Sequence, residues 1–313
     1  MEHGNNIDMM TLSWFVPEIR ESLQHVAHAL DELRANPHGQ DAIKRARLHL
    51  HQTHGALQVA GIYGVALLTE EAEHVISAFE DGVLEADESS IDVLKMVMRA
   101  ITEYLEDMQA SGTSIPVLVL YPYYRDLVGL RKAVQPDPAA LFDVDLDRAL
   151  PASVRAMISD APDREERAKS AARGFERALP ALIRGENVVA AIDGLHEAMG
   201  RMLRNQPHVG ARLFYWLSYA LLDGLKHGAL KVDLATRRAV GRINIQNRHL
   251  FTGQSDVPPQ FIKELLIILA QAGSGSAVVE EVKRHFHLAS LVPADYERRR
   301  YGLADPETIR IAR

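Results

Sequence analysis

The sequence contains no cysteine. This absence excludes disulfide bonds, thiolate nucleophiles and every zinc or iron–sulfur site that depends on cysteine ligands. Stable disulfides belong to oxidising compartments, so a chain without cysteine fits the reducing cytoplasm. We therefore expect a cytoplasmic protein whose fold depends on noncovalent packing.

Long apolar runs are also missing. No stretch approaches the roughly 18 apolar residues that a membrane-spanning helix requires, and the run from Phe214 to Leu222 is interrupted by Ser218. Residues 1–15 lack the positively charged start and continuous apolar core of a secretory signal. The sequence predicts neither a membrane span nor a secretory signal.

An excess of positive charge, the usual mark of a nucleic-acid-binding protein, is absent. The formal net charge is −7, and the 35 lysines and arginines are spread along the chain. We therefore expect no nucleic-acid partner. The 313 residues, 47% of them hydrophobic, are sufficient for two globular domains.

Strict alternation of apolar and polar residues, the pattern of half-buried strands, does not persist over any long window. Apolar residues instead recur at steps of three and four, which places them on one face of a helix. The first such series is Leu12, Phe15, Ile19, Leu23, Val26, Leu30 and Leu33, and similar series occupy 43–57, 65–79, 91–108 and 120–130. We expect the first helix to end near Asn36 and Pro37, and Ser89 or Ser90 to cap the fourth.

The helical pattern is then interrupted by four prolines: Pro136, Pro138, Pro151 and Pro162. We interpret 134–164 as a linker. Helical periodicity returns in series at 175–183, 189–202, 213–221, 240–247 and 261–269. The sequence therefore predicts an all-α fold with two domains, a bundle of four or five helices over 8–133 and a second helical bundle over 165–313.

Aromatic residues are scarce, at 6% of the chain, and only two of them are tryptophans. We expect Trp14 and Trp216 to lie in the two cores. We expect Tyr121, Tyr123 and Tyr124 to seat the fifth helix against the first bundle, although tyrosine clusters are also typical of partner-binding surfaces.

One helix of the first domain carries the chemistry that the sequence offers. Leu50, Thr53 and Leu57 share its buried face. The opposite, exposed face is predicted to carry Lys44, Arg47, His51, His54 and Gln58. An exposed imidazole with nearby cations, followed one turn later by the small residue Gly55, is suited to accept a phosphoryl group from a partner protein.

The spacing His51-x-x-x-Gly55, with Gly61 ten residues after the histidine and Glu73 on the next helix, resembles the histidine phosphotransfer (Hpt) domains of two-component relays. The resemblance implies a helical bundle with His51 as the phosphoacceptor and Gly55 as the residue that leaves room for the partner. The sequence departs from the Hpt pattern at two positions, where Thr53 replaces a leucine and His54 replaces a lysine. We therefore expect His54 to be either a helper near the phosphoryl group or a surface residue.

Longer segments extend the resemblance. LSWFVPEIRESLQHVAHAL and IPVLVLYPYYRDL are similar to the N-terminal region of the ChpA/PilL-type chemotaxis hybrid kinases of the type IV pilus system, a region shared with the scaffold protein FimL. LIRGENVVAAIDGLHEAMGRML and FIKELLIILAQAGSGSAVVEEVKRHFHL are similar to the second FimL-type domain. The resemblance implies regulation of pilus motility through protein–protein interaction, with a response-regulator receiver domain or other pilus-signalling proteins as partners.

Other chemistries have weaker support. A metal site built on His49, His51, His54 and His74 is not expected, because only His51 and His54 share a helical face. His196 and Gly200 repeat the His-x-x-x-Gly spacing, but Gln206 stands where a second glycine would be needed, so we interpret them as structural. No cofactor site is expected, and the glycine-rich ATP lid of a kinase is missing.

Two functions remain open from the sequence. In the first, the chain is a phosphorelay module in a chemotaxis-like system that controls type IV pili, with His51 exchanging a phosphoryl group with a receiver aspartate. In the second, it is a scaffold without chemistry that docks pilus or response-regulator proteins. In neither case is the chain an enzyme by itself.

Overall fold

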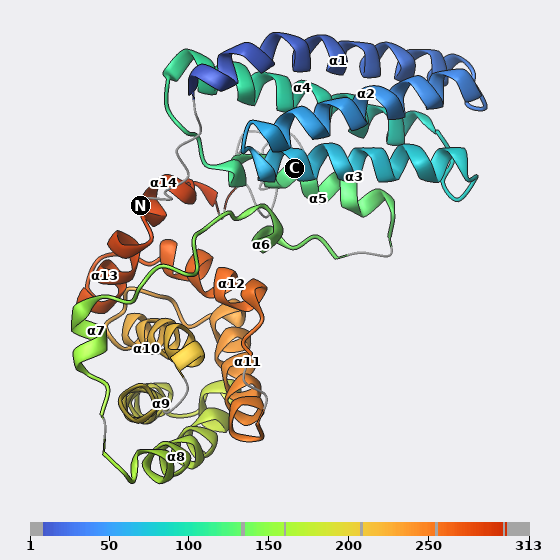
Figure 1. Cartoon of the computed structure of the whole chain (residues 1–313). Coiled ribbons are helices and arrows are strands. Elements are labelled where there is room, and N and C mark those ends of the chain that lie inside the picture. The colour runs from blue at the N-terminus through green and yellow to red at the C-terminus, as the bar shows by residue number, and fades with distance from the viewer. Residues whose placement is uncertain are drawn as a thin grey trace, which may run out of the picture. The chain divides into compact units, whose positions relative to one another are not determined.

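The computed structural model describes residues 9–132, 135–159, 161–206, 209–253, 256–296 and 298. Every regular element in these ranges is a helix (Figure 1), which confirms the all-α fold class. The contacts divide the chain into two compact units, 1–143 with 290–313, and 144–289. The boundary after Asp143 falls inside the predicted linker, and the described residues from Ser290 onward belong to the first unit although they follow the second unit in the chain. No helix within the described ranges is long and apolar enough to cross a membrane.

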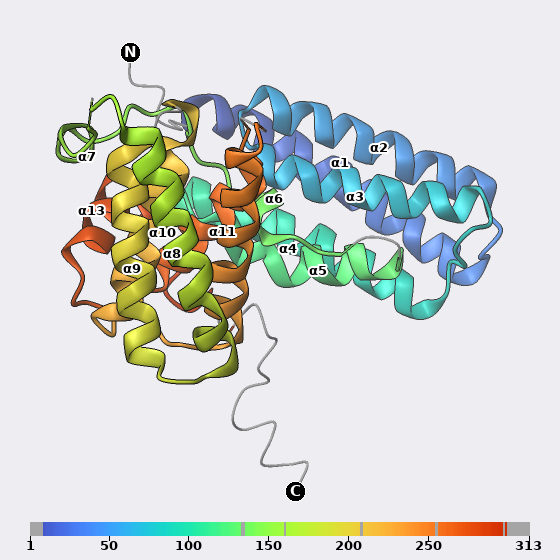
Figure 2. The same cartoon turned by 90° about the horizontal axis from the view of Figure 1, so that it is seen from below.

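The first unit is a bundle of long helices that run side by side (Figures 1 and 2). Its elements are α1 (Met9–Ala35), α2 (Gln40–Val59), α3 (Tyr63–Glu80), α4 (Glu88–Ser111), the 3-10 helix η1 (Val117–Leu120), α5 (Tyr121–Leu130) and α6 (Pro138–Leu141). Helix α1 packs against α2 and α4, α2 packs against α3, and α5 packs against α3 and α4. The apolar series of the sequence form the core, because residues at steps of three and four, such as Ile19, Leu23 and Leu30, are fully buried.

The helix ends follow local backbone chemistry. Helix α1 stops at Ala35, two residues before Pro37, as predicted. The predicted cap of α4 is wrong. The residue that caps α4 is Asp87, whose carboxylate accepts a 2.8 Å hydrogen bond from the backbone N–H of Ser90. Asp87 has the extended backbone of an N-cap, whereas Ser90 already lies inside the helix.

The two tryptophans differ in burial. Trp216 is buried in the second unit, as predicted, but Trp14 is 78% exposed, so its expected place in the core is wrong. The buried face of α1 is defined by Val16, Ile19 and Leu23. Because each residue turns a helix by about 100°, Trp14 lies roughly 200° around the axis from Val16 and faces away from the core.

Two of the three tyrosines expected to seat α5 in the bundle are buried there, whereas Tyr123 is half-buried. Tyr121 and Tyr124 are buried, and the ring of Tyr121 lies 6.2 Å from that of Tyr296. Tyr104 of α4 donates a 2.6 Å hydrogen bond from its hydroxyl to the carbonyl of Ile115, which fixes the chain just before η1. Burial raises the pKa of the Tyr104 hydroxyl, so the group stays neutral and remains a donor.

The second unit surrounds a central apolar helix, α10. Its elements are α7 (Ala152–Ala156), α8 (Arg164–Arg184), α9 (Val188–Asn205), the 3-10 helix η2 (Val209–Ala211), α10 (Arg212–Lys226), α11 (Leu234–Phe251), α12 (Pro259–Ala270) and α13 (Ala277–His285), and α14 (Leu288–Leu291) contains the boundary between the units. Helix α10 packs against α9, α12 and α13, while α8 packs against α9 and α11. The large side chains of Phe214, Tyr215 and Trp216 on α10 are all buried, so this helix supplies the centre of the second core.

A buried aspartate on α10 connects three helices of this unit. Asp223 accepts hydrogen bonds from His196 Nε2 of α9 at 3.0 Å and from Ser276 Oγ, the N-cap residue of α13, at 2.6 Å. His227 Nδ1 lies 3.3 Å from the same carboxylate. Burial by itself would raise the pKa of Asp223, but the hydrogen bonds from His196 and Ser276 outweigh burial and lower it.

The first prediction concerns Gly64, which lies in α3 where the helix meets η1 and α6. A Cβ atom at this position would lie 2.7 Å from Val117 Cγ1 and 3.1 Å from the carbonyl oxygen of Leu141. We expect Gly64→Ala to lower the free energy of unfolding by about 1–3 kcal/mol, because the backbone carbonyl cannot move aside freely. The control is Gly55→Ala, where a Cβ would meet nothing within 4 Å. Urea unfolding of both variants measures the difference. Equal free energies of unfolding for Gly64→Ala and Gly55→Ala would contradict the close packing around Gly64.

The second prediction concerns Asp223. Its pKa is lower in the folded than in the unfolded chain, so its contribution to stability is present above about pH 4 and is lost as the pH falls through the folded value. We expect Asp223→Asn to lower the free energy of unfolding at pH 7 by about 1–3 kcal/mol, because one of the donors loses its acceptor. Between about pH 5 and pH 3, the variant should lose less stability than the parent.

Asp193→Asn is the matched control for this experiment. Asp193 pairs with Lys226 at 2.9 Å, but its side chain is about half exposed, so its removal should cost little. Urea unfolding over a pH series compares the three proteins. If Asp223→Asn and the parent lost stability in parallel on acidification, the role assigned to the carboxylate would be wrong.

Candidate functional site

Helix α2 presents one polar face to solvent. Its buried residues are Ala42, Ile43, Ala46, Leu50, Thr53 and Leu57. Because these residues occupy one side of the helix, Lys44, Arg47 and His51 project from the other side and are exposed. The His51 side chain is 73% exposed, so its ring is accessible to another protein.

The orientation of the His51 ring is set from the neighbouring helix. Its Nδ1 atom lies 3.4 Å from Oε2 of Glu73 on α3. A carboxylate can only accept hydrogen bonds, so this contact places the ring proton on Nδ1. In this tautomer Nε2 carries the lone pair, so Nε2 is the ring atom with nucleophilic character.

Two other carboxylates of α3 pair with arginines. Glu80 Oε2 pairs with Arg47 Nη1 at 2.5 Å. Glu71 Oε2 pairs with Arg131 Nη1 of α5 at 2.8 Å. The two arginines therefore neutralise Glu80 and Glu71, while Glu73 faces the imidazole of His51.

The two glycines of the motif have different structural roles. Gly55 lies within α2, and a Cβ atom added there would meet nothing within 4 Å, so this residue leaves open space one turn after His51. Gly61 follows the C-terminal end of α2 with a φ of +74°, in the left-handed region that favours glycine. Gly55 keeps the surface clear beside His51, whereas Gly61 forms the turn into α3.

His54 does not lie on the exposed face of α2, where the sequence placed it, and it is not a simple surface residue. It is half-buried, and its Nδ1 lies 3.0 Å from the backbone carbonyl oxygen of Ala66 on α3. The carbonyl accepts the hydrogen bond, so Nδ1 carries a proton and the ring is fixed against α3. The structure thus gives His54 a role in joining α2 to α3.

His49 turns toward α1. Its ring stacks on that of His25, with ring centroids 4.8 Å apart. Burial and the nearby His25 lower the pKa of His49, so its ring is neutral near pH 7. Within the described ranges, no three residues of the types His, Cys, Asp and Glu converge on a point where they could hold a metal ion.

His196 has a buried environment despite the same His-x-x-x-Gly spacing. Its ring hydrogen-bonds to Asp223 and stacks on Tyr219, with ring centroids 4.7 Å apart. A Cβ atom on Gly200 would lie 3.2 Å from that tyrosine ring. Gly200 therefore makes room for Tyr219 and not for an external partner, which agrees with the structural interpretation of this pair.

Sequence reasoning missed three exposed apolar side chains, two on α2 and one at the start of α3. Leu48, Val59 and Tyr63 are each more than half exposed. Leu48 precedes His51 by one turn of α2, and Val59 follows Gly55 by one turn. Leu48 and Val59 are not part of the series of buried residues on α2. An apolar residue outside such a series is expected at the surface, and this is the sequence signal that indicates them.

Comparison with known proteins follows this division of the chain. Residues 10–111, which contain α1 to α4, match the Hpt domain. Residues 160–299 match the FimL scaffold protein second domain. Scaffold protein FimL from Pseudomonas aeruginosa is 22% identical over 290 residues, which cover 91% of this chain and 51% of that protein. The chain therefore spans about half the length of this curated relative, and no solved structure gives a significant match.

These matches confirm the resemblance predicted from the sequence. The matched Hpt region carries His51, Gly55 and Glu73, and the matched second domain carries the Asp223 network. The chain is thus similar, along most of its length, to an Hpt domain followed by the second domain of a FimL scaffold protein.

Proposed function

We propose that the chain is a signal-transduction module in which His51 accepts and returns a phosphoryl group, within a chemotaxis-like phosphorelay that controls type IV pilus motility. The observation that carries this proposal is the geometry of His51. Its ring is exposed, its Nδ1 faces Glu73 at 3.4 Å, and its Nε2 is accessible, in a bundle that matches the Hpt domain. The connection to pili comes from the resemblance to the pilus chemotaxis kinases and to FimL.

The proposed donor is the aspartyl phosphate of a response-regulator receiver domain. The Nε2 lone pair attacks phosphorus, an N–P bond forms, and the bond between phosphorus and the aspartate oxygen breaks, so that the carboxylate leaves. The proton on Nδ1 stays in place, and the ring therefore gains positive charge during the attack. The Glu73 carboxylate stabilises this charge, and the receiver supplies the magnesium ion and its own catalytic groups.

The surface around His51 fits approach by such a partner. Gly55 leaves open space beside the ring. Lys44 lies on the same exposed face of α2, where its positive charge attracts an acidic phosphorylation site. The chain contributes a presented imidazole, and the phosphate originates from ATP used elsewhere in the relay.

The alternative function is a scaffold without phosphotransfer. His54 favours it, because the lysine of the Hpt pattern is replaced by a half-buried ring that is bound to the carbonyl of Ala66. The flexible ammonium group of the Hpt pattern is therefore replaced, three residues after His51, by a ring held against α3. In this alternative the exposed faces of the helices dock pilus or response-regulator proteins and His51 takes no part.

The third prediction separates the two functions. We expect the parent chain to be labelled by a phosphorylated receiver domain and His51→Gln to remain unlabelled, because glutamine has no nucleophilic ring nitrogen. The label should be acid-labile, as phosphoramidates are, and mass mapping should place it on α2. The absence of label on the parent, with retained binding to the receiver, would leave the scaffold as the function.

His28→Gln is a close control for this measurement. The His28 side chain is 74% exposed and lies 3.5 Å from Glu32, so it matches His51 in exposure and in having a carboxylate neighbour. His28 differs from His51 because it lies on α1, where Glu32 and not a glycine follows one turn later. His28→Gln should keep the full label, and a loss of label from this variant would contradict the assignment of His51.

The fourth prediction concerns Glu73. We expect Glu73→Gln to slow phosphotransfer by about tenfold to a hundredfold, because a neutral amide stabilises the developing imidazolium less well. The free energy of unfolding should change by less than about 1 kcal/mol, since the partner of Glu73 is exposed. Rapid-quench phosphotransfer and urea unfolding measure the two effects separately.

Glu70→Gln supplies the matched charge change one turn earlier on α3. It removes one negative charge from the same surface without removing the contact to His51. A rate equal to that of Glu73→Gln would show that local net charge, and not the contact with Nδ1, governs the reaction.

A further inference from the structure

The contact between His51 and Glu73 is too weak to maintain its own geometry. The distance from Nδ1 to Oε2 is 3.4 Å, near the upper limit for a hydrogen bond, and the histidine side chain is 73% exposed. An exposed pair of this kind contributes little free energy, and holding its two side chains in one geometry costs conformational entropy. Other contacts must therefore hold α3 so that Glu73 remains opposite the ring.

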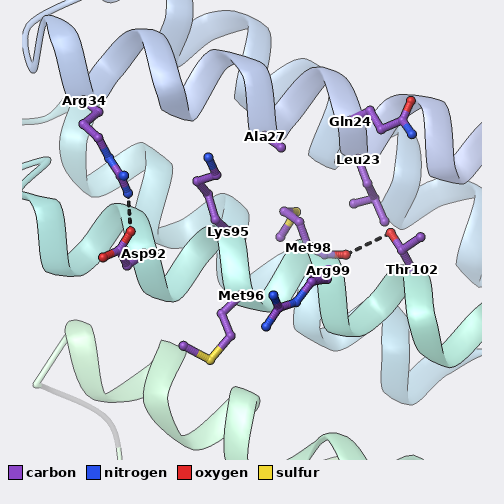
Figure 3. A pocket seen from close by; sticks show the side chains of 10 residues that line it. All are labelled: Leu23, Gln24, Ala27, Arg34, Asp92, Lys95, Met96, Met98, Arg99 and Thr102. Atoms are coloured by element: carbon purple, nitrogen blue, oxygen red, sulfur yellow. Dashed lines mark hydrogen bonds and ion pairs between the residues drawn. The ribbon is translucent and has the colours of Figure 1, made fainter.

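Polar contacts between α1 and α4 do not act on this pair of helices. Figure 3 shows the α1–α4 groove, an open recess of about 550 Å³ in which Arg34 pairs with Asp92. Lys95 of α4 also pairs with Asp31 of α1, at 2.5 Å. All four residues lie on α1 and α4, so these ion pairs join α4 to α1. The position of α3 against α2 depends on contacts made by α2 and α3 themselves.

Two polar contacts join α2 to α3 on either side of the imidazole. Arg47, which precedes it on α2, pairs with Glu80 of α3 at 2.5 Å. His54, which follows it, has its Nδ1 3.0 Å from the carbonyl oxygen of Ala66. Both partners lie seven residues from Glu73, roughly 10 Å along the axis of α3. Since hydrophobic attraction is non-directional, such directional contacts define the register of the two helices more sharply than apolar packing does.

The two flanking contacts differ in how firmly they hold α3. The Arg47 side chain is about half exposed, and its long chain reaches only the end of another flexible side chain. The His54 ring is half-buried on a short side chain, and its partner is a backbone atom. A backbone carbonyl cannot move without its helix, so the contact made by His54 constrains the position of α3 itself.

The carbonyl of Ala66 is a well-fixed acceptor. Ala66 is buried, and the hydroxyl of Thr69, which is buried too, donates a 2.7 Å hydrogen bond to the same oxygen. The bond from Thr69 stays within α3, whereas the bond from His54 crosses to α2. Loss of the histidine would leave the oxygen with its partner in α3, so no buried acceptor would be left unsatisfied. The change would remove the connection between the helices and little else.

We propose that His54 is a positioning residue for the candidate phosphoacceptor. Its bond to Ala66 sets the register of α3 against α2, and this register holds the Glu73 carboxylate opposite Nδ1 of His51. His54 does not touch the reacting atoms and acts through Glu73. Its effect on phosphotransfer rests on the proposed function, whereas its effect on the tautomer of His51 does not.

The fifth prediction concerns that tautomer. Nitrogen-15 NMR of the histidine rings distinguishes the Nδ1–H from the Nε2–H form of His51 in the uncharged ring, at about pH 9. The parent should hold the Nδ1–H form, because the carboxylate accepts from that atom. We expect His54→Leu to lose at least about half of this form, because a histidine ring without a partner prefers the Nε2–H tautomer.

Two further variants separate the hydrogen bond from the bulk of the ring. His54→Asn should keep the parent tautomer, because asparagine places an N–H group at the same number of bonds from Cα as Nδ1 of histidine. Glu73→Ala gives the reference signal for a His51 ring without its carboxylate. If His54→Leu does not fold, His54→Ala takes its place with the same expectation, because alanine is the best helix former.

His49→Leu is the matched control. His49 lies on the same helix and is half-buried like His54, but its ring stacks on His25 of α1. The same substitution there should disturb the contact of α2 with α1 and leave the tautomer of His51 as in the parent.

Rapid-quench phosphotransfer tests the consequence for the reaction. We expect His54→Leu to slow labelling about tenfold and His54→Asn to stay within about twofold of the parent. The double variant His54→Leu with Glu73→Gln should be no slower than Glu73→Gln alone, because both changes act on one contact. Independent, multiplying effects would show that His54 does not act through Glu73.

Three tautomer results would overturn the proposal. They are a parent tautomer in His54→Leu, an equal change in His49→Leu, and a failure of His54→Asn to keep the Nδ1–H form. The second would indicate general loosening of α2, and the third would show that the ring and not its hydrogen bond matters. A parent chain that accepts no label would remove the proposed phosphotransfer, while the tautomer would still decide whether His54 positions α3.

Discussion

The burial of one face of α2 between α1 and α3 determines what the opposite face presents. Leu50 and Leu57 are fully buried, and together they fix the rotation of α2 about its own axis. His51 is one residue after Leu50, so this rotation directs its ring toward solvent beside α3. The bond from His54 to the carbonyl of Ala66 adds a polar contact between the same two helices. The exposed imidazole is therefore a consequence of core packing.

The surface of α3 then gives the imidazole its electrostatic surroundings. Arg47 neutralises Glu80 and Arg131 neutralises Glu71, whereas Glu73 contacts the His51 ring. A single carboxylate against Nδ1 fixes the tautomer and leaves Nε2 free. Carboxylates on this surface repel an incoming phosphoryl group, because like charges at short range oppose each other. The arginine pairs on either side reduce that repulsion.

Periodicity was sufficient to predict the long helices and the exposure of Lys44, Arg47 and His51, because both depend on which residues share a helical face. It did not predict the short helices α6 and α7 within the linker, nor the half-buried position of His54. It failed at Trp14, which is apolar but lies outside the buried series of α1. Tertiary contacts were not accessible from one sequence. The approach of Glu73 to His51 depends on the register of α3 against α2, and the convergence of His196 and Ser276 on Asp223 joins residues far apart in the chain. The α1–α4 groove likewise exists only once both helices are in place.

The contrast between His51 and His196 bears on the phosphotransfer role proposed for His51. Both are followed by a glycine four residues later, and each lies near a carboxylate. The His196 pair is buried and joins α9 to α10, so the fold would lose stability without it. The His51 pair is exposed, and such pairs contribute about 0–1 kcal/mol. Stability therefore does not account for an exposed histidine beside Glu73 and an uncrowded glycine, whereas the proposed presentation of an imidazole to a receiver domain uses all three.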